Sequence, residues 1–376
     1  MSNKKLSRRS MLILLVSVGG LTALAQPALK NQAIFAQKEL RLSAPLKLQL
    51  TQLRADIAKN KYSFTVGATD VLDKPDSQLY GEILPTNIGD IARKQAPLSR
   101  KILDLDKEER ERIVKAKPAL RAKIYEFNIV ANPSLKKWDW RKQGKVTSIR
   151  NQAPAGTCWA FAVTAALESS WLVRNSINID GSEQFMIAYS GAGTTSGGNR
   201  ADAAAWLTSK GTVAEVTAPY TGSASTSVPS SSATPYDALA WGFVDESNVL
   251  PSVQKLKQAL CEHGPITIGI YSDNNLKAYT GGVFDHVDPS NNASNHAVLL
   301  VGWDDDKGAW IVKNSWGSGW GDECDYGTEK GYFYAKYGCH NVGYRAIWVK
   351  AASQVYVINP ALLKDLRLAP DVLKLR

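Results

Sequence analysis

The segment TCWAFAVTAALESSWLV, residues 157–173, restricts the fold of this chain more than any other. Small or apolar residues fill nearly every position, so a helix formed here would have little polar surface to turn toward solvent. Such a helix belongs in the core of a sizeable domain. The small and flexible residues just before it predict that the helix begins near Cys158.

The remaining elements of residues 133–350 run from helices to strands. One helix is expected within residues 196–211, and an amphipathic helix is expected at 253–263 before a Gly-Pro pair. Short apolar runs bounded by turns then predict strands at 266–271, 296–303, 308–314 and 331–337. This order favours an α+β unit with a helical half and a sheet half.

Residues 26–132 differ in composition from the unit at 133–350, because they contain no cysteine, histidine or tryptophan. Alternating residues at 62–66 predict a short strand. Charged helix formers predict a helix at 106–128, interrupted near Pro118. We expect a mixed, mainly helical region here, followed by the unit at 133–350. Residues 351–376 form a C-terminal extension with one possible strand at 355–358.

Residues 1–25 have the features of an export signal. Basic residues precede an apolar run at 11–25 that is too short to span a bilayer comfortably, and Ala23-Leu24-Ala25 fits a cleavage site. The motif at 7–12, SRRSML, is typical of twin-arginine export. We expect an extracytoplasmic, periplasmic or secreted protein of bacterial origin with no stable membrane span after signal removal. A general secretory signal or an uncleaved anchor remains the alternative.

The net charge of +10 does not indicate a nucleic-acid partner. Residues 1–132 carry 23 of the 45 Lys and Arg and 13 of the 35 Asp and Glu, so the basic excess lies outside the cysteine-containing unit. No recognisable nucleic-acid-binding module collects these basic residues. Four cysteines in 376 residues also exclude a disulfide-built scaffold.

Cys158 suits a nucleophile as well as a core residue. A thiol at the first turn of a helix lies in the positive end of the helix dipole, but it still needs a base. His296 opens a predicted buried strand, where a polar ring needs a reason, and Asn314 could fix its tautomer. His263 is expected at a helix end, and His286 and His340 are expected in solvated loops. The spacing of the cysteines and histidines predicts no metal site.

The chain resembles the papain-like cysteine peptidases. His296 and Asn314 follow Cys158 by 138 and 156 residues, near the separations that this family shows. Further blocks in the family order are WDWRKQGKVTSIRNQ, SGGNRADAAAWL, LKQALCEHGPITIGI, NHAVLLVGW and KNSWGSGWG, within 133–350. The resemblance implies a two-lobed fold, with a helical lobe and an antiparallel β-barrel-like lobe.

The resemblance also implies roles for individual residues. Cys158 would be the nucleophile, His296 its ion-pair partner and Asn314 the group that holds His296. In such pairs the thiol pKa falls to about 3–4. Gln152 and the Cys158 backbone N–H would stabilise the oxyanion. The substrate-binding residues would be Gly197, Gly198, Trp316, Arg200, Ala297 and Gly269, with Trp316 also shielding the His–Asn bond and Arg200 a candidate for favouring acidic side chains.

The chain departs from the family in its cysteines, since Ala155 occupies the position where a cysteine is usual. Cys324 and Cys339 could bridge around the intervening hairpin, and Cys261 is expected to be a buried free thiol. The family is made as zymogens, so residues 26–132 are expected to be an inhibitory propeptide. A binding domain retained in the mature protein is the alternative.

We therefore expect an exported zymogen of an endopeptidase that hydrolyses peptide and protein substrates through an acyl-thioester. It would need no cofactor and no metal, bind no nucleic acid, and be a monomer. Two alternatives remain open. One is a cell-wall peptide amidase or transferase that uses the same thiol chemistry, and the other is a catalytically silent binding protein.

Overall fold

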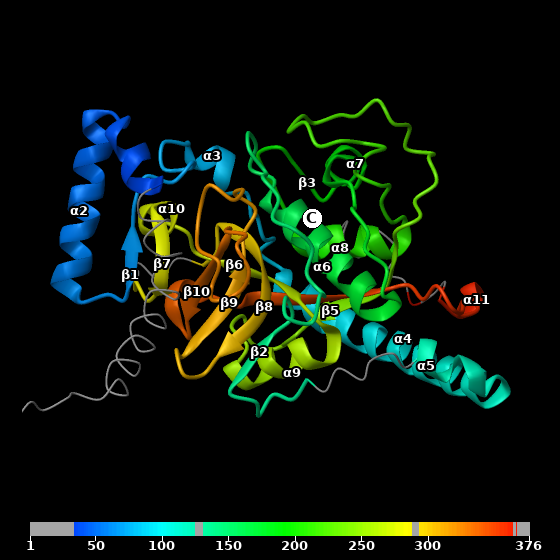
Figure 1. Ribbon diagram of the computed structural model, residues 1–376. Helices are drawn as coiled ribbons and strands as arrows, with labels where there is room; N and C mark the ends of the chain where they lie inside the picture. Colours follow the sequence, from blue (N-terminus) through cyan, green and yellow to red (C-terminus); the bar gives the residue numbers. More distant parts are fainter. Residues whose placement is uncertain (1–33, 125–130, 288–292, 364–365, 367–376) are drawn as a thin grey trace, which may run out of the picture.

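A computed structural model describes residues 34–124, 131–287, 293–363 and 366 (Figure 1). The expected export segment lies outside these ranges. Within them, a nine-stranded sheet has the order β1-β7-β10-β9-β8-β6-β11-β5, with β2 paired to β8. Its strands are β1 (Phe64–Val66), β2 (Lys137–Asp139), β5 (Ala238–Phe243), β6 (Ile266–Ile270), β7 (Tyr279–Phe284), β8 (His296–Asp304), β9 (Ala309–Lys313), β10 (Tyr332–Lys336) and β11 (Tyr344–Ala351), and a separate ribbon joins β3 (Gly193–Thr194) to β4 (Gly197–Gly198).

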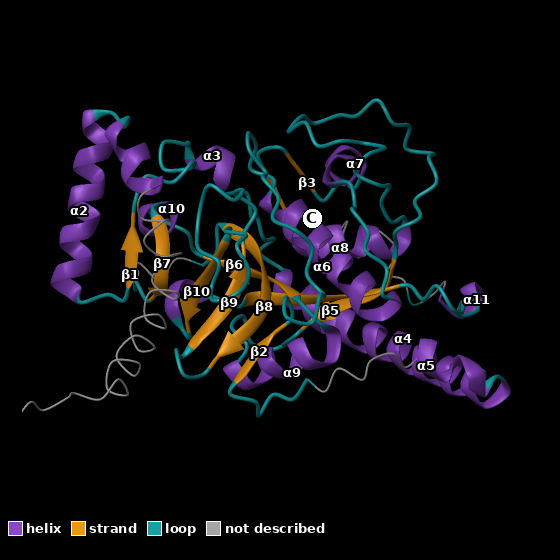
Figure 2. Cartoon of the chain, viewed as in Figure 1, coloured by secondary structure: helices purple, strands orange, loops and turns teal. Residues whose placement is uncertain are grey.

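Most strands of the large sheet lie at the centre of the view in Figure 2, with α4 to α8 on one side, α2, α3 and α10 on the other, and α9 below. All pairings in the large sheet are antiparallel except β7 with β10. The α+β class is therefore confirmed. The helices are α2 (Ala44–Asn60), α3 (Asp76–Leu79), α4 (Ile88–Ala116), η1 (Pro118–Leu120), α5 (Arg121–Ile124), α6 (Cys158–Asn175), α7 (Glu183–Tyr189), α8 (Arg200–Ser209), α9 (Val253–His263), α10 (Asn274–Lys277), η2 (Cys339–Asn341) and α11 (Pro360–Leu363).

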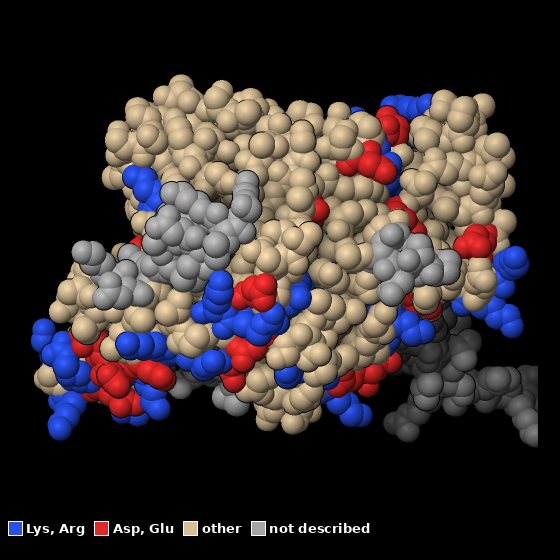
Figure 3. Space-filling model, turned by 180° about the vertical axis from the view of Figure 1, so that it is seen from behind, with Lys and Arg blue, Asp and Glu red and all other residues tan. Residues whose placement is uncertain are grey.

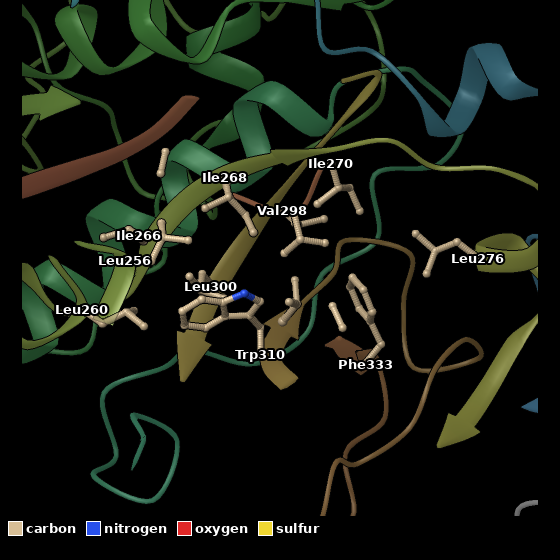
Figure 4. Close-up of a cluster of buried hydrophobic side chains, with 14 of the residues drawn as sticks. Leu256, Leu260, Ile266, Ile268, Ile270, Leu276, Val298, Leu300, Trp310 and Phe333 are labelled. Carbon is tan, nitrogen blue, oxygen red and sulfur yellow. The ribbon is translucent and has the colours of Figure 1, made fainter. Parts of the chain in front are cut away.

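The core of the sheet half lies between α9 and the faces of four strands. Leu256 and Leu260 of α9 point toward Ile266 and Ile268 of β6 and Leu300 of β8 (Figure 4). Each side chain of this kind contributes about 1.5–3 kcal/mol when it is buried. The alternating and apolar patterns that predicted β6, β8, β9 and β10 reflect this burial.

Helix α6 is buried as its sequence requires, and it contacts β8, β11 and α8. It begins at Cys158, with Thr157 at the N-cap position. The strand β8 that contacts it begins at His296. The fold therefore sets the start of a helix from one half against the start of a strand from the other.

The described N-terminal residues, 34–124, pack on the unit at 133–350 and add a strand to its sheet. The strand predicted at 62–66 is present as β1, which pairs with the edge strand β7. The helix predicted at 106–128 begins much earlier, at Ile88, and contains Pro97 in its interior. Proline disfavours helix interiors strongly, which hid the first half of α4 from sequence analysis. The interruption near Pro118 is confirmed.

The strand expected at 355–358 is absent from the described C-terminal residues. Val355 and Val357 are exposed, whereas Ile358 is buried against the core. The alternating pattern thus arises from an extended segment that packs on one side without pairing to the sheet. The short helix α11 follows it.

The face shown in Figure 3 intermixes acidic and basic side chains along its lower half and is mainly uncharged above. That face offers no broad surface of a single sign. Of the helices in the described residues, none combines the length and apolar character that crossing a bilayer requires.

Candidate active site

Cys158 occupies the first position of α6, where unpaired backbone N–H groups make the helix end electropositive. Its side chain is fully buried and packs against Ala162 of its own helix and Ala297 of β8. Ala297 follows His296 directly. Cys158 at the start of α6 therefore lies against the start of β8, the strand that begins at His296.

His296 is held by an amide and an indole. Its Nε2 atom lies 2.8 Å from Asn314 Oδ1, which fixes the tautomer that carries hydrogen on Nε2. The ring stacks on Trp316 with 4.7 Å between centroids. No hydrogen-bond partner for Nδ1 occurs in the described part of the chain. Asn314 therefore leaves Nδ1 as the ring nitrogen that is open to proton exchange.

Gln152 is fully buried, and its amide is oriented from both ends. Ser315 Oγ donates to Gln152 Oε1 at 2.7 Å. Gln152 Nε2 then donates to the carbonyls of Gln78 and Leu79, at 3.2 and 3.1 Å. Carbonyl oxygens of the N-terminal region thus accept the hydrogen bonds of Gln152 Nε2, the group that the family resemblance assigned to the oxyanion.

Residues 78–83 cover the thiol, and we call them the covering segment. The backbone N–H groups of Gly81 and Glu82 donate to Asn295 O at 3.1 and 3.0 Å. Gly198 N–H donates to Gly81 O at 2.8 Å, and Ile83 N–H donates back to Gly198 O at 2.9 Å. The segment therefore binds both flanks of Cys158 through its main chain.

Gly197 and Gly198, which the family resemblance assigned to the substrate-binding site, lie against the covering segment. Gly197 has φ 140°, a conformation that favours glycine. A Cβ atom at Gly197 would lie 2.6 Å from Ile83 Cδ1. The paired glycines therefore leave the room that the covering segment uses.

Burial controls the ionisation of both reactive groups in this closed arrangement. Desolvation raises the pKa of Cys158 to about 12. Desolvation also lowers the pKa of His296 to about 4, although its hydrogen bond with Asn314 opposes the shift. In this closed arrangement, burial favours the neutral thiol and the neutral imidazole over the ion pair that the family resemblance implies.

Arg200 lies at the start of α8 and is fully buried, where it pairs with Glu82 of the covering segment. Arg200 also donates to Thr267 O and to Tyr344 O, each at 3.0 Å. Ser294 Oγ donates to the second carboxylate oxygen of Glu82. A carboxylate is thus enclosed by one cation and one hydroxyl.

Gly269 and Ala297 stand opposite each other on β6 and β8. A Cβ atom at Gly269 would lie 2.4 Å from Glu82 Oε2 and 3.1 Å from Arg200 Nη2. Glycine is therefore required if a carboxylate is to reach the guanidinium. Gly269 and Arg200 thus meet around one acidic side chain, that of Glu82, while Ala297 contacts Cys158.

The prediction of a disulfide between Cys324 and Cys339 is wrong, because both thiols are free. Cys324 and Cys339 are buried in two different hydrophobic clusters of the fold. Cys339 Sγ instead donates to Phe284 O at 3.3 Å. Cys261 is free, as expected, but only half-buried.

Sequence analysis missed two residues that orient others in the site. Glu82 pairs with Arg200, and Ser315 donates a hydrogen bond to Gln152. Glu82 lies in a segment without helical or strand periodicity, so no local signal marked it. Ser315 stood inside the KNSWGSGW block, and its position beside Asn314 could have drawn attention to it.

Known proteins resemble the chain in sequence and in fold. A family model described as papain family cysteine protease matches residues 135–346. Cathepsin L of Sarcophaga peregrina is 32% identical over 195 residues, covering 49% of this chain and 56% of its own length. Fruit bromelain of Ananas comosus is 28% identical over 273 residues, covering 70% and 67%. The matched segment thus spans little more than half to two-thirds of these curated relatives.

A solved structure extends the likeness to the N-terminal region. Digestive procathepsin L2 from the larval midgut of Tenebrio molitor has a TM-score of 0.61 and 21% identity, covering 89% of this chain and 99% of its own. At that identity the similarity shows the fold alone. The two-lobed fold with a preceding region, as in a proenzyme, is confirmed.

Proposed function

The chain belongs to the papain family of cysteine proteases, and we propose that it is a cysteine endopeptidase made as a zymogen. The observation that supports this most is the hydrogen bond from His296 Nε2 to Asn314 Oδ1, which leaves Nδ1 for the thiol of Cys158. The orientation of Gln152 by Ser315 also supports catalysis over a silent binding role.

The proposed reaction passes through an acyl-thioester. Cys158 transfers its proton to His296 and attacks the carbonyl carbon of the peptide bond. Gln152 Nε2 and the Cys158 backbone N–H stabilise the oxyanion. The C–N bond breaks as His296 gives its proton to the amine. Water, activated by His296, then cleaves the thioester to release the carboxylic acid and restore the thiol.

Inhibition by residues 26–132 is part of the proposal. The covering segment engages Gly198, Asn295 and Gln152, the groups that a bound peptide would also need. Activation then requires removal of this segment, with the mature chain starting near residues 130–137. Mass spectrometry of the activated protein tests this, and an N-terminus before residue 78 in a fully active enzyme contradicts it.

Thiol labelling tests the peptidase function itself. After removal of the N-terminal region, an epoxide-type thiol inhibitor should label the protein once, and peptide hydrolysis should cease. Cys158→Ala should abolish labelling and lower activity by roughly 10⁵-fold or more. Cys261→Ala is the matched control, since Cys261 is free and half-buried, and should change neither. An activated wild-type protein that is not labelled would favour the silent binding protein.

Export by the twin-arginine route completes the proposal, supported by SRRSML at residues 7–12. A protein without disulfides suits a pathway that carries folded chains out of a reducing compartment. Fusion of residues 1–30 to a reporter tests the route. Undiminished export in cells that lack the twin-arginine transporter would contradict it.

A further inference from the structure

A second group of histidines lies at the rim of the sheet, away from Cys158. Asp273 follows β6, His286 follows β7 and His340 lies in η2 after β10. We propose that these three side chains bind one divalent transition-metal ion of the zinc type. The site is separate from the peptidase mechanism, which uses none of these residues.

The distances among the three side chains suit such an ion. His286 Nδ1 lies 2.8 Å from His340 Nε2 and 3.1 Å from Asp273 Oδ2. His340 Nε2 lies 3.9 Å from the same Asp273 oxygen. Ligand atoms at about 2.0–2.1 Å from a tetrahedral zinc ion stand about 3.3 Å apart, within this range. Two imidazoles and a carboxylate are also ligands that zinc prefers over magnesium or calcium.

His340 is arranged to present a lone pair toward the other two. Its Nδ1 atom lies 2.8 Å from the Tyr271 carbonyl oxygen, which can only accept a hydrogen bond. The hydrogen of a neutral His340 is therefore on Nδ1, and Nε2 faces His286 and Asp273 as an acceptor. A backbone carbonyl behind a histidine is the arrangement that orients metal-binding imidazoles.

Without a metal, one hydrogen on His286 Nδ1 shared between His340 Nε2 and Asp273 Oδ2 can hold the three side chains together. A divalent cation in the place of that hydrogen would attract all three ligand atoms at once. The His340 backbone is also held at φ 42°, an uncommon conformation for a residue other than glycine and one that recurs at functional sites.

An ion could reach the site. The side chains of His286 and Asp273 are 14% and 19% exposed, whereas that of His340 is 1% exposed. The expectation that His286 and His340 are both solvated is therefore wrong. Zinc sites with one coordination position left open for water use three protein ligands, the number that this group offers.

A bound ion would join three loops, and two of them contact the N-terminal region. Tyr62 packs edge-on against His286, with 5.3 Å between ring centroids. Tyr80 of the covering segment donates to Asp273 O at 3.4 Å and packs near His296. The metal would thus hold one wall against which both tyrosines rest, and it would stabilise the closed protein.

Metal titration of the full chain tests the proposal, with Cys158→Ala as background so that the reactive thiol cannot bind metal. Zinc at neutral pH should bind at one ion per chain by calorimetry and raise the Tm. Cobalt should give the optical spectrum of a tetrahedral nitrogen and oxygen site. His286→Gln and Asp273→Asn should each weaken zinc binding by more than about 100-fold, the upper loss for outer partners of such sites.

His263→Gln is the matched control, because His263 stacks on Trp348 outside the group, and it should leave zinc binding unchanged. Unfolding without metal checks that each variant is folded. The proposal is overturned if zinc does not bind, if binding persists in both His286→Gln and Asp273→Asn, or if the cobalt spectrum shows thiolate bands.

Discussion

Two buried acid–arginine pairs connect the N-terminal region to the rest of the molecule, and they differ in what surrounds them. Glu82 pairs with Arg200 from an irregular segment over the thiol. Asp106 pairs with Arg174 from the middle of α4, at the lower right in Figure 1. Both carboxylates are fully buried.

The second pair is part of a larger network. Asp106 lies 3.3 Å from Arg110 and 3.7 Å from Lys350, and it accepts a hydrogen bond of 2.7 Å from Tyr356 of the C-terminal extension. Burial alone would raise the pKa of Asp106, but Arg174 and Lys350 outweigh it and lower the pKa. The Glu82 pair has one cation, and main-chain carbonyls share that cation with it.

The difference separates a contact that can be exchanged from one that is structural. A peptide with an acidic side chain could replace Glu82, because Arg200 and Ser294 need only a carboxylate. Nothing comparable can replace Asp106 without moving α4 from the sheet. We expect the two pairs to respond differently to mutation, pH and substrate.

The largest effect is expected for Asp106→Ala. It leaves the buried Arg174 and the partly buried Lys350 without an anion, so the proenzyme should lose about 3–5 kcal/mol of its free energy of unfolding. Asp104→Ala, at an exposed position of the same helix, is the control and should change stability by less than about 0.5 kcal/mol. Denaturant unfolding of the full chain measures both. Equal effects would mean that the network adds no stability.

Acid pH should open the covering segment before it loosens α4. His296 has a pKa of about 4 under the segment and an ordinary value of about 6.5 when exposed. Its contribution to closure is complete above about pH 6.5 and is lost as pH falls toward 4. Closure should weaken on the order of 100-fold by pH 4.5.

Hydrogen exchange measures this difference, after correction for the intrinsic rate at each pH. The amides of Gly81, Glu82 and Ile83 should lose protection between pH 7 and 4.5. Those of α4 should retain it, because the lowered pKa of Asp106 keeps its contribution to stability until pH falls below the ordinary aspartate range. Parallel loss in both places would contradict the comparison.

Glu82→Gln should have a smaller effect, since the amide keeps the shape and part of the hydrogen bonding. Loss of a hydrogen-bonded charge should cost about 1.5–3 kcal/mol of closure, seen as faster activation of the full chain. Glu39→Gln is the control, because its partner Arg54 is exposed, and activation should be unchanged. An unaltered activation rate for Glu82→Gln would show that the main chain alone holds the segment.

Arg200→Met in the activated enzyme should show the smallest effect. We expect kcat/KM to fall about 10-fold for peptides with an acidic side chain at the Arg200 site, and to hold for neutral peptides, since a partly hydrated ion pair contributes little more than 1 kcal/mol. Arg174→Met should change neither. A substrate library without any acidic preference in the unmodified enzyme would remove this role for Arg200.

Much of the reactive site was predictable because its signals are local. The apolar helix at 157–173 required a core, and its start defined the place of Cys158. His296 at the head of a buried strand and Asn314 after the next one were unusual polar residues in apolar surroundings. By contrast, the sequence analysis missed β5, β7 and β11, and Pro97 made the predicted α4 too short. These elements are stabilised by strand pairing and packing, which leave no clear periodic pattern in the sequence.

The sequence by itself determined which residues could be reactive and which segments had to be buried, because burial leaves a periodic trace along the chain. Only the tertiary structure decided which distant groups meet. It placed Glu82 on Arg200, buried Cys324 and Cys339 in different hydrophobic clusters, and gathered Asp273, His286 and His340 at one rim. These contacts depend on strand order and register, and the sequence of a short loop does not specify which other loop it will contact.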